Sequence, residues 1–365
     1  MALRKALALS TEITPASTVV LPEAQWTLHV ARTRWMFTVC SENLHCFDLA
    51  TGQMVGSVIL PSQVSPKLLG GQAQSNGSIV LAFPYMQKQN DEMTWKIEFM
   101  SVTFLQEQND PVKTSFGSLK CITLPPAVSR QFTRFDMLLM EDQYVVLSGD
   151  WGSRKFIFID WRLEHVVVQS FPQLWRTFSW EISDGRIIII CDSLEIKVIN
   201  VRQALSMYDK ESVLEPSTAC SLSRYRSVHF AKGDYGQVSA IALCVPNNQA
   251  GLGIFQISST LIQGQNDTVA TSPGVHDGTL LDRCLANQHT SAIPLYIGST
   301  LAFQIDDHHI ALKSHQKRRN ASEMRLGLTG LHLNAILAVD EDIGMIAVKE
   351  MDNIGRAQIR IYWVI

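Results

Sequence analysis

A six-residue pattern at 44–49, with the sequence LHCFDL, recurs along the whole chain and constrains the fold more than any other feature. The copies that share its apolar frame are IEFMSV at 97–102, FIFIDW at 156–161, IKVINV at 196–201, LGIFQI at 252–257, HHIALK at 308–313 and IRIYWV at 359–364. They start 53, 59, 40, 56, 56 and 51 residues apart. Each copy lies among β-branched and aromatic runs separated by turn residues, which is typical of strands. Seven copies at a period near fifty residues predict an all-β fold, a seven-bladed β-propeller with one four-stranded sheet in each blade.

Strand-like runs can be assigned within the repeats. The clearest blades, the first and the third, are expected to contain strands at 25–30, 35–40, 44–49, 54–60, 135–140, 144–148, 155–161 and 165–171. The second blade is expected from strands at 67–69, 78–83, 95–105 and 119–124, with a long polar loop at 87–94. A helical turn is expected at 202–208, and the acidic run at 340–342 is expected to be a solvated hairpin turn.

The two ends of the chain predict how the ring closes. The β-branched run Thr18 to Leu21 has no strand nearby to pair with, and the last blade offers only three strands, at 336–339, 345–349 and 358–364. We expect the N-terminal strand to complete the last blade, because an open sheet edge invites aggregation. The predicted organisation is an N-terminal extension with the latch strand at 1–24 and a single β-propeller domain at 25–365.

Composition narrows the cellular setting and the partners. The net charge of −3 gives no reason to expect a nucleic acid or an anionic membrane as partner. Seven cysteines without a C-x-x-C pair favour a reducing compartment, so we expect a cytoplasmic or nuclear protein. No run of eighteen apolar residues exists that would predict a spanning helix, and the apolar stretch at the N-terminus is too short for a signal peptide.

No residue pattern predicts catalysis, a metal site or a cofactor. The nucleophile elbow, the phosphate loop and the H-E-x-x-H zinc motif are all missing. Asp306 to His309, with His315 after them, gather acids and histidines, but neighbours along a strand point to opposite faces and do not converge on one ion. The run at 340–342 lacks the spaced ligands of a calcium loop. We therefore expect a chain that is not an enzyme.

One turn stands out as a candidate contact for a protein partner. Trp151 and Arg154 lie in or beside the expected turn that begins at Gly149, where a large ring has less core to enter. Tryptophan and arginine are enriched among the residues that dominate protein interfaces. The other tryptophans of this region, Trp161, Trp175 and Trp180, are interpreted as core packing.

The motif endings Phe47-Asp48 and Ile159-Asp160 stand where a WD-repeat carries its Trp-Asp pair. The sequences LHCFDLATG at 44–52 and LAVDEDIG at 337–344, the latter followed by IRIY at 359–362, resemble the first and last blades of the divergent propellers found after the F-box in fungal F-box proteins of mushroom-forming species. The resemblance implies an intracellular module that recruits substrates to a cullin-type ubiquitin ligase. Only about 24 residues precede the first blade, so we expect the ligase adaptor as a partner only if an F-box is present elsewhere.

A second class of function stays open, since propellers also serve as quinone-dependent dehydrogenases and glycosidases. Such an enzyme needs carboxylates from three or more blades that converge at the mouth of the central channel. A binding module instead carries aromatic and basic residues on loops of one face. The inner strands of this chain are largely apolar, which favours the non-catalytic module with an as yet unknown protein partner.

Overall fold

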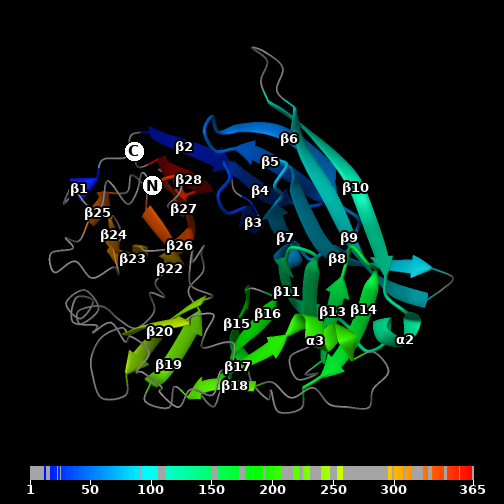
Figure 1. The fold of residues 1–365 in the computed structure, drawn as a ribbon. Helices are drawn as coiled ribbons and strands as arrows, with labels where there is room; N and C mark the ends of the chain where they lie inside the picture. Colours follow the sequence, from blue (N-terminus) through cyan, green and yellow to red (C-terminus); the bar gives the residue numbers. More distant parts are fainter. Residues whose placement is uncertain are drawn as a thin grey trace.

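The computed structural model describes most of the chain. The residues described are 12–13, 17–22, 24, 26–89, 92–105, 112–149, 155–171, 177–183, 185–191, 195–207, 217–221, 225–230, 240–246, 253–257, 295–297, 300–306, 309–314, 324–327, 331–340, 343–352 and 354–363. Within them the chain is almost entirely β-strand, arranged in seven separate sheets that we number in chain order. In Figure 1 these sheets follow one another around the molecule from blue through green to red.

The first four sheets each contain four strands that pair antiparallel in chain order. Sheet 1 consists of β3 (Trp26–His29), β4 (Trp35–Cys40), β5 (Asn43–Asp48) and β6 (Gln53–Ile59). Sheet 2 consists of β7 (Gly70–Ala73), β8 (Ile79–Gln89), β9 (Glu92–Leu105) and β10 (Lys113–Thr123). Sheet 3 consists of β11 (Phe135–Glu141), β12 (Tyr144–Gly149), β13 (Lys155–Asp160) and β14 (His165–Ser170). Sheet 4 consists of β15 (Thr177–Ser183), β16 (Arg186–Cys191), β17 (Glu195–Asn200) and β18 (Ser217–Ser221).

The last three sheets complete the described part of the chain. Sheet 5 consists of β19 (Tyr225–Phe230), β20 (Ala240–Pro246) and β21 (Gly253–Ile257). Sheet 6 consists of β22 (Leu295–Ile297), β23 (Thr300–Asp306), β24 (His309–Ser314), β25 (Met324–Gly327) and the N-terminal β1 (Glu12–Ile13). Sheet 7 consists of β26 (Leu331–Asp340), β27 (Met345–Met351), β28 (Ala357–Trp363) and the N-terminal β2 (Ser17–Pro22).

The all-β prediction is confirmed, and so are the strands expected in the first and third repeats, to within about two residues. The predicted helical turn is present as α3 (Val201–Ser206), which Asn200 caps by accepting a hydrogen bond from the Gln203 amide at 3.0 Å. Two further short helical segments, η1 (Pro66–Leu68) and α2 (Pro126–Ser129), connect strands.

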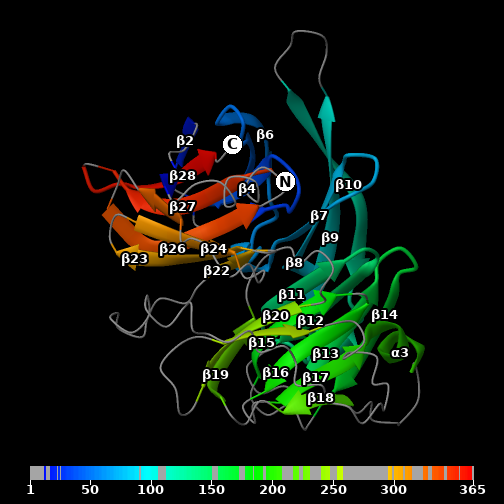
Figure 2. The same cartoon turned by 60° about the vertical axis from the view of Figure 1, so that its left-hand side comes forward.

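Two expectations for sheet 2 are wrong. The run at 67–69 is no strand: Pro66 starts the turn η1, and the Leu68 amide donates to the Ser65 carbonyl at 3.0 Å. Leu68 and Leu69 are nevertheless buried, which explains the misleading apolar pattern. The polar stretch at 87–94 is no long loop, because β8 and β9 stay paired up to Gln89 and Glu92. Backbone hydrogen bonds hold this end of the hairpin, which needs no apolar side chains, and the long strands of sheet 2 project beyond their neighbours (Figures 1 and 2).

Apolar side chains fill both faces of the central sheets. In sheet 3, Val145 and Ile157 pack into the core shared with sheet 2, whereas Val146 and Phe158 pack into the core shared with sheet 4. Successive residues of a strand point to opposite faces, so a strand covered on both sides is apolar at every position. Equivalent cores join sheet 1 to sheet 2 and sheet 7 to sheet 1. Five sheets, from sheet 7 through sheet 4, are therefore packed face to face in succession.

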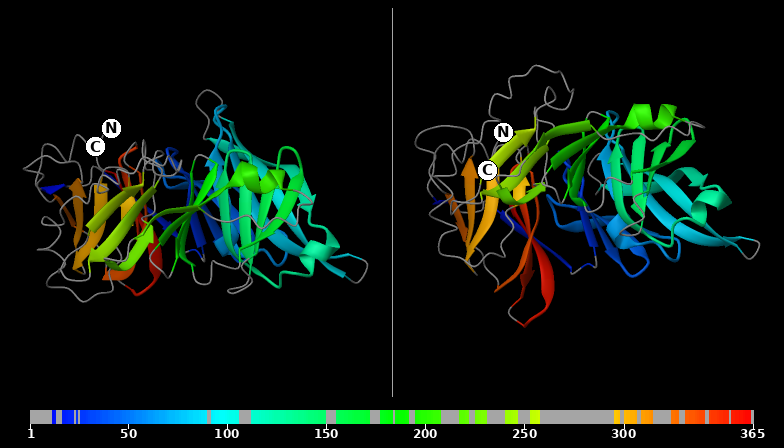
Figure 3. Two further views of the ribbon diagram at one scale, coloured as in Figure 1. Left: turned by 60° about the horizontal axis from the view of Figure 1, so that its bottom comes forward. Right: turned by 90° about the horizontal axis from the view of Figure 1, so that it is seen from below.

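The predicted pairing of the N-terminal strand with the end of the chain is confirmed. β2 pairs antiparallel with β28 from Ser17 opposite Trp363 to Pro22 opposite Gln358. Leu21 is fully buried in the core between sheets 7 and 1. The red strands of sheet 7 and the blue strands of the N-terminal half lie side by side in Figure 3. The sequence did not reveal β1, which pairs parallel with β25 and so adds the same N-terminal segment to sheet 6 as well.

A repeated hydrogen bond joins neighbouring sheets at the turn between their first two strands. In each case a turn amide of one sheet donates to a side-chain oxygen of the preceding sheet: Arg32 to Asp340 at 2.6 Å, Asp142 to Gln72 at 2.7 Å, and Gly185 to Glu141 at 2.7 Å. The three donor residues have φ values of 62°, 49° and 67°, in that order. The left-handed turn aims the amide out of its own sheet and toward the neighbour.

The expectation of a solvated turn at 340–342 is wrong for Asp340, because this residue is buried at the end of β26. Its side chain is only 6% exposed, and besides the Arg32 amide it accepts a hydrogen bond from the Ile343 amide at 3.2 Å. His29 lies beside it, with Nε2 3.8 Å from Oδ2. Burial lowers the pKa of His29, an effect that the carbonyl of Thr33 and the charge of Asp340 oppose.

Candidate functional site

The aspartates that carry the likeness to a WD-repeat fix turns. Asp48 ends β5 and accepts a hydrogen bond from the Ala50 amide at 3.0 Å. Asp160 ends β13 and accepts from the Arg162 and Leu163 amides, each at 3.1 Å. Both side chains are buried. These carboxylates therefore shape the turns between the third and fourth strands, and each positions an arginine beside a tryptophan.

Two tryptophans stack on β9 from the two neighbouring sheets. Trp35 of sheet 1 stacks on Phe104, with ring centroids 4.0 Å apart and an interplanar angle of 6°. Trp161 of sheet 3 stacks on Phe99 at 5.1 Å and donates its indole N–H to the Asp142 carbonyl at 3.0 Å. Successive side chains of β9 point to opposite faces, so Phe99 and Phe104 reach different neighbours.

An arginine lies over each of these indoles. The guanidinium of Arg34 is 4.8 Å from the ring centroid of Trp35 and 3.1 Å from the Asp48 carboxylate. The guanidinium of Arg162 is 5.5 Å from the centroid of Trp161. Among the described residues, Arg162 has no carboxylate partner. Cation–π contact holds both side chains over an aromatic face.

Sheets 2 and 3 together form a surface that we call the rim surface, made of Leu119, Lys120, Trp161, Arg162 and Leu163. The pairing of β10 with β9 skips Leu119, and this β-bulge leaves its side chain 48% exposed. Leu163 in the turn before β14 is 75% exposed. The Lys120 ammonium joins the two elements, because it donates to the Arg162 carbonyl at 3.0 Å and lies 3.0 Å from the Glu164 carboxylate.

The rim surface has the composition of a protein contact. Two exposed leucines, an indole and a guanidinium that has no carboxylate partner within the described ranges combine apolar area with an available charge. Clustered exposed apolar side chains often mark interaction sites. The interpretation of Trp161 as core packing is confirmed, since its partly buried ring stacks on Phe99 and packs against the core between sheets 2 and 3. Its neighbours Arg162 and Leu163 are exposed. In the sequence, Asp160 before the Trp-Arg-Leu run indicates the turn that presents Arg162 and Leu163.

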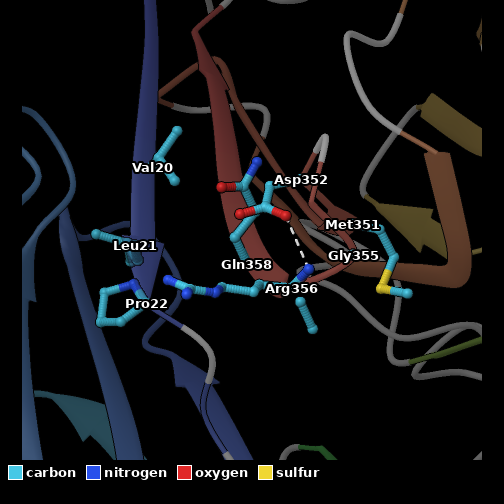
Figure 4. Close-up of a pocket in the computed structure, with 9 residues that line it drawn as sticks. Val20, Leu21, Pro22, Met351, Asp352, Gly355, Arg356 and Gln358 are labelled. Atoms are coloured by element: carbon cyan, nitrogen blue, oxygen red, sulfur yellow. Dashed lines mark hydrogen bonds between the residues drawn. The ribbon is translucent and has the colours of Figure 1, made fainter.

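A pocket of about 780 Å³ lies where the chain ends meet in sheet 7 (Figure 4). Its lining consists of Val20, Leu21 and Pro22 of β2, Met351 and Asp352 at the end of β27, and Gly355, Arg356, Ala357 and Gln358 leading into β28. Its lining is mixed, with apolar side chains from β2 and Met351 opposite the polar side chains Asp352, Arg356 and Gln358. We call it the seam pocket.

A buried carboxylate lies on the same sheet. Glu350 of β27 is completely buried, accepts a hydrogen bond from the Tyr362 hydroxyl and lies 2.6 Å from Nε of Arg360. The two partners satisfy its charge, as a buried carboxylate requires. Its register partner Gln358 lines the seam pocket.

The candidate residues from the sequence, Trp151 and Arg154, lie outside the described residues. So do Asp307, His308 and His315, whereas the backbones of Asp306 and His309 are paired in register between β23 and β24. Within the described ranges no group of three or more His, Cys, Asp or Glu side chains could hold a metal ion. None of the helices there is long and apolar enough to cross a membrane.

Two of the described thiols, Cys46 and Cys121, have a raised pKa. Burial, and to a smaller extent the charge of Asp48, raises the pKa of the Cys46 thiol far above its usual value. Burial likewise raises the pKa of Cys121, whose sulfur lies 3.7 Å from the Tyr85 hydroxyl. A reactive cysteine needs a lowered pKa.

No protein-family model and no curated protein matches the sequence. Among solved structures, the chain is similar to Hsv2 of Kluyveromyces lactis, with 10% identity over 94% of this chain and 98% of that one at a TM-score of 0.46. It is similar to the WD40 domain of SCAP from fission yeast, with 8% identity over 97% and 98% at a TM-score of 0.45. It is also similar to Raptor of Chaetomium thermophilum, with 10% identity over 100% of this chain and 30% of that one at a TM-score of 0.49. The description of the fold therefore rests on the strand pairing within this chain.

Proposed function

We propose that the chain is a closed seven-bladed β-propeller, with residues 1–24 as an extension carrying the latch strand and 25–365 as one domain, and that it serves as a non-catalytic protein-interaction module. Seven strand copies in the sequence and seven sheets among the described residues support the blade number. The pairing of β2 with β28 and the core between sheets 7 and 1 support closure. A closed ring satisfies sheet edges that would otherwise remain open.

The rim surface is the observation that carries the interaction role. A binding module needs a rigid scaffold that presents aromatic, arginine and apolar groups to a partner. Asp160 fixes the turn that presents Arg162 and Leu163, and the stack of Trp161 on Phe99 fixes its base. Trp151 and Arg154 remain a second predicted contact with the protein partner.

The resemblance to propellers of F-box proteins suggests what the module is for. We propose that it recruits substrates to a cullin-type ubiquitin ligase inside the cell, in the cytoplasm or the nucleus. In this role the propeller would hold the substrate, and a ligase adaptor would join only through an F-box supplied elsewhere.

Quantitative affinity purification of the full chain from its native cell tests the interaction role. The variant Leu163→Glu places a charge on the rim surface and should lower the recovery of a partner at least about tenfold, since a hot-spot residue contributes on the order of 2 kcal/mol. Ile59→Glu is the matched control, because Ile59 is 73% exposed at the end of β6 in sheet 1. It should leave recovery unchanged. Equal recovery with both variants would show that the rim surface is not the contact.

Two additional measurements separate the finer proposals. Trp151→Ala should lower partner recovery with little change in melting temperature, and a large loss of stability would instead make Trp151 a core residue. Ubiquitylation of the recovered partner, measured with and without an F-box fused to the chain, tests the recruiting role. A partner whose ubiquitylation is the same in both conditions would remove that role while leaving the interaction module intact.

A further inference from the structure

The seam pocket has the chemistry to hold a carboxylate that is attached to an aliphatic body. We propose that it binds such a group on a partner polypeptide, and that this binding fastens the latch strand β2 to sheet 7. The inference rests on the proposed function in one respect, namely that the natural occupant belongs to a partner protein.

Arg356 supplies the charge. It ends the turn between β27 and β28 with an exposed side chain, and among the described residues its guanidinium has no hydrogen-bond or ion-pair partner. In Figure 4 the side chain extends across the pocket toward Leu21 and Pro22, away from the turn that bears it. A guanidinium can bind a carboxylate through two parallel hydrogen bonds.

The acid in the pocket does not neutralise this arginine. Asp352 turns one carboxylate oxygen, Oδ1, toward its own turn, where it accepts from the Ile354 amide at 2.9 Å and the Arg356 amide at 2.7 Å. The Asp352 amide in turn donates to the Arg356 carbonyl at 2.8 Å. Asp352 therefore shapes the turn and leaves the guanidinium of Arg356 available for an external anion.

The walls select for an aliphatic body next to the charge. Val20, Pro22 and Met351 are apolar, and Val20 is 46% exposed although it lies within a strand. A hydrophilic anion such as inorganic phosphate would leave this apolar surface in water. A leucine, valine or similar side chain beside the carboxylate would cover it, and each buried methylene is favourable.

The position of the pocket links occupancy to the latch. One wall belongs to β2 and the opposite wall to the turn and the start of β28, so a bound group touches both partners of the terminal pairing. A ligand that binds the paired state and not the open state stabilises the paired state by mass action. The occupant would therefore protect the amides of β2 from hydrogen exchange.

Methyl-labelled full chain, titrated with short peptides, tests the proposal. Acetyl-Ala-Leu-Leu with a free terminal carboxylate represents the end of a partner chain, and acetyl-Leu-Glu-Leu-amide represents an acidic side chain within one. We expect at least one of them at millimolar concentration to shift the Val20 and Leu21 methyl resonances and to slow amide hydrogen exchange at residues 17–21. The peptide that binds identifies the source of the carboxylate. Acetyl-Ala-Leu-Leu-amide, which lacks any carboxylate, should do neither.

Variants of the chain decide whether Arg356 is responsible. Arg356→Gln should weaken binding about 10- to 100-fold, as expected for the loss of a charge-assisted pair, and Arg356→Lys should recover part of it. Arg130→Gln is the matched control, because that guanidinium is 68% exposed next to α2 and does not line the pocket. Equal binding by Arg356→Gln, equal binding of the amide peptide, or no methyl shift with either acid would overturn the proposal.

The result is independent of the capture experiment on the rim surface. If the peptides fail while Leu163→Glu abolishes partner recovery, only the seam pocket proposal is lost. If a peptide binds while no partner is recovered, the pocket stands and the proposed function falls.

Discussion

The junction between sheets 7 and 1 differs instructively from the junction between sheets 2 and 3. Both combine an apolar core with a turn amide that donates to a side chain of the preceding sheet. At the first junction the acceptor is the buried carboxylate of Asp340, and at the second it is the side-chain amide oxygen of the half-buried Gln72, in a contact that solvent reaches. The first junction also carries β2 and a hydrogen bond from the Trp363 indole to the Leu49 carbonyl at 3.1 Å.

The difference follows from chain connectivity. Sheets 2 and 3 are joined by a short covalent link through α2, so a solvated contact is sufficient to set their registration. In sheet 7 only β2 is close in sequence to sheet 1, whereas β26, β27 and β28 come from the far end of the described chain. Arg32 and Asp340 lie 308 positions apart, and the loss of entropy on bringing such distant segments together must be offset by buried contacts. We therefore expect the seam between sheets 7 and 1 to depend on its few contacts more than the other junction does.

The largest effect is expected from deleting residues 1–22. The deletion removes β2, uncovers the core around Leu21 and leaves the edge of β28 open, so we expect a melting temperature lower by 10 °C or more, on the order of several kcal/mol, together with aggregation. Differential scanning calorimetry and light scattering measure both. Deletion of residues 1–16, which spares β2, is the control and should lose far less. A 1–22 deletion as stable and monomeric as the full chain would remove the latch.

A single side chain should reproduce part of this effect. Leu21 is fully buried and its neighbour Val20 is 46% exposed on the same strand. Leu21→Ala should cost about 2–5 kcal/mol in the free energy of unfolding, because it leaves a cavity in the core. Val20→Ala should cost less than about 1 kcal/mol. Chemical denaturation of the two variants gives the comparison, and similar losses would mean that β2 is held by its backbone alone.

The polar contacts of the two junctions can be compared directly. Asp340→Ala leaves the Arg32 amide without its buried acceptor and should destabilise the protein by about 1–3 kcal/mol. Gln72→Ala breaks an exposed contact and should cost about 0.5 kcal/mol or less. Both values come from the same denaturation measurement. Equal costs would show that connectivity does not decide how much each junction depends on its polar contact.

The smallest effect is expected from acidification. Burial keeps the pKa of His29 below its ordinary value near 6.5, so the folded state favours the neutral imidazole. The unfolded chain binds a proton there more readily, and the free energy of unfolding should therefore fall as the pH drops below about 6.5. His29→Gln should flatten this part of the pH profile. A profile that is unchanged in the variant would assign the acid sensitivity to other groups.

The sequence predicts the strands better than it predicts the contacts between sheets. Continuous apolar runs such as 144–148 mark strands buried on both faces, since the neighbours on either side are sheets of the same kind. The pairing of Thr18 to Leu21 with the last strand can be predicted, because the last repeat contains three strands where a blade needs four and the N-terminal strand has no other partner nearby. The role of Asp340 does not follow, because its partners Arg32 and His29 lie near the other end of the chain and the acidic run around it is typical of a solvated turn.

The candidate site was only partly visible for a similar reason. A tryptophan in a strand pattern gives no information about what lies beyond its ring, so Trp161 could not be distinguished from a core residue. The rim surface around it also includes Leu119, a bulge residue that local sequence does not mark, and Lys120, whose ammonium donates to the Arg162 carbonyl of the next sheet. The role of Arg356 could not be predicted from the sequence either, because the seam pocket is formed only when β2 pairs with β28.

The shared N-terminal segment also sets the order of events during synthesis. β2 leaves the ribosome first among the strands of sheet 7, and its partner β28 follows much later, since 314 positions separate Leu49 from Trp363 alone. At roughly 5–20 residues per second this interval lasts roughly 15 to 60 s. Throughout that time the β-branched strand β2 has no β28 to pair with. A second nascent chain on the same messenger RNA could supply a strand for it to pair with instead. Slow translation of the final repeat should therefore favour strand exchange between chains over correct closure.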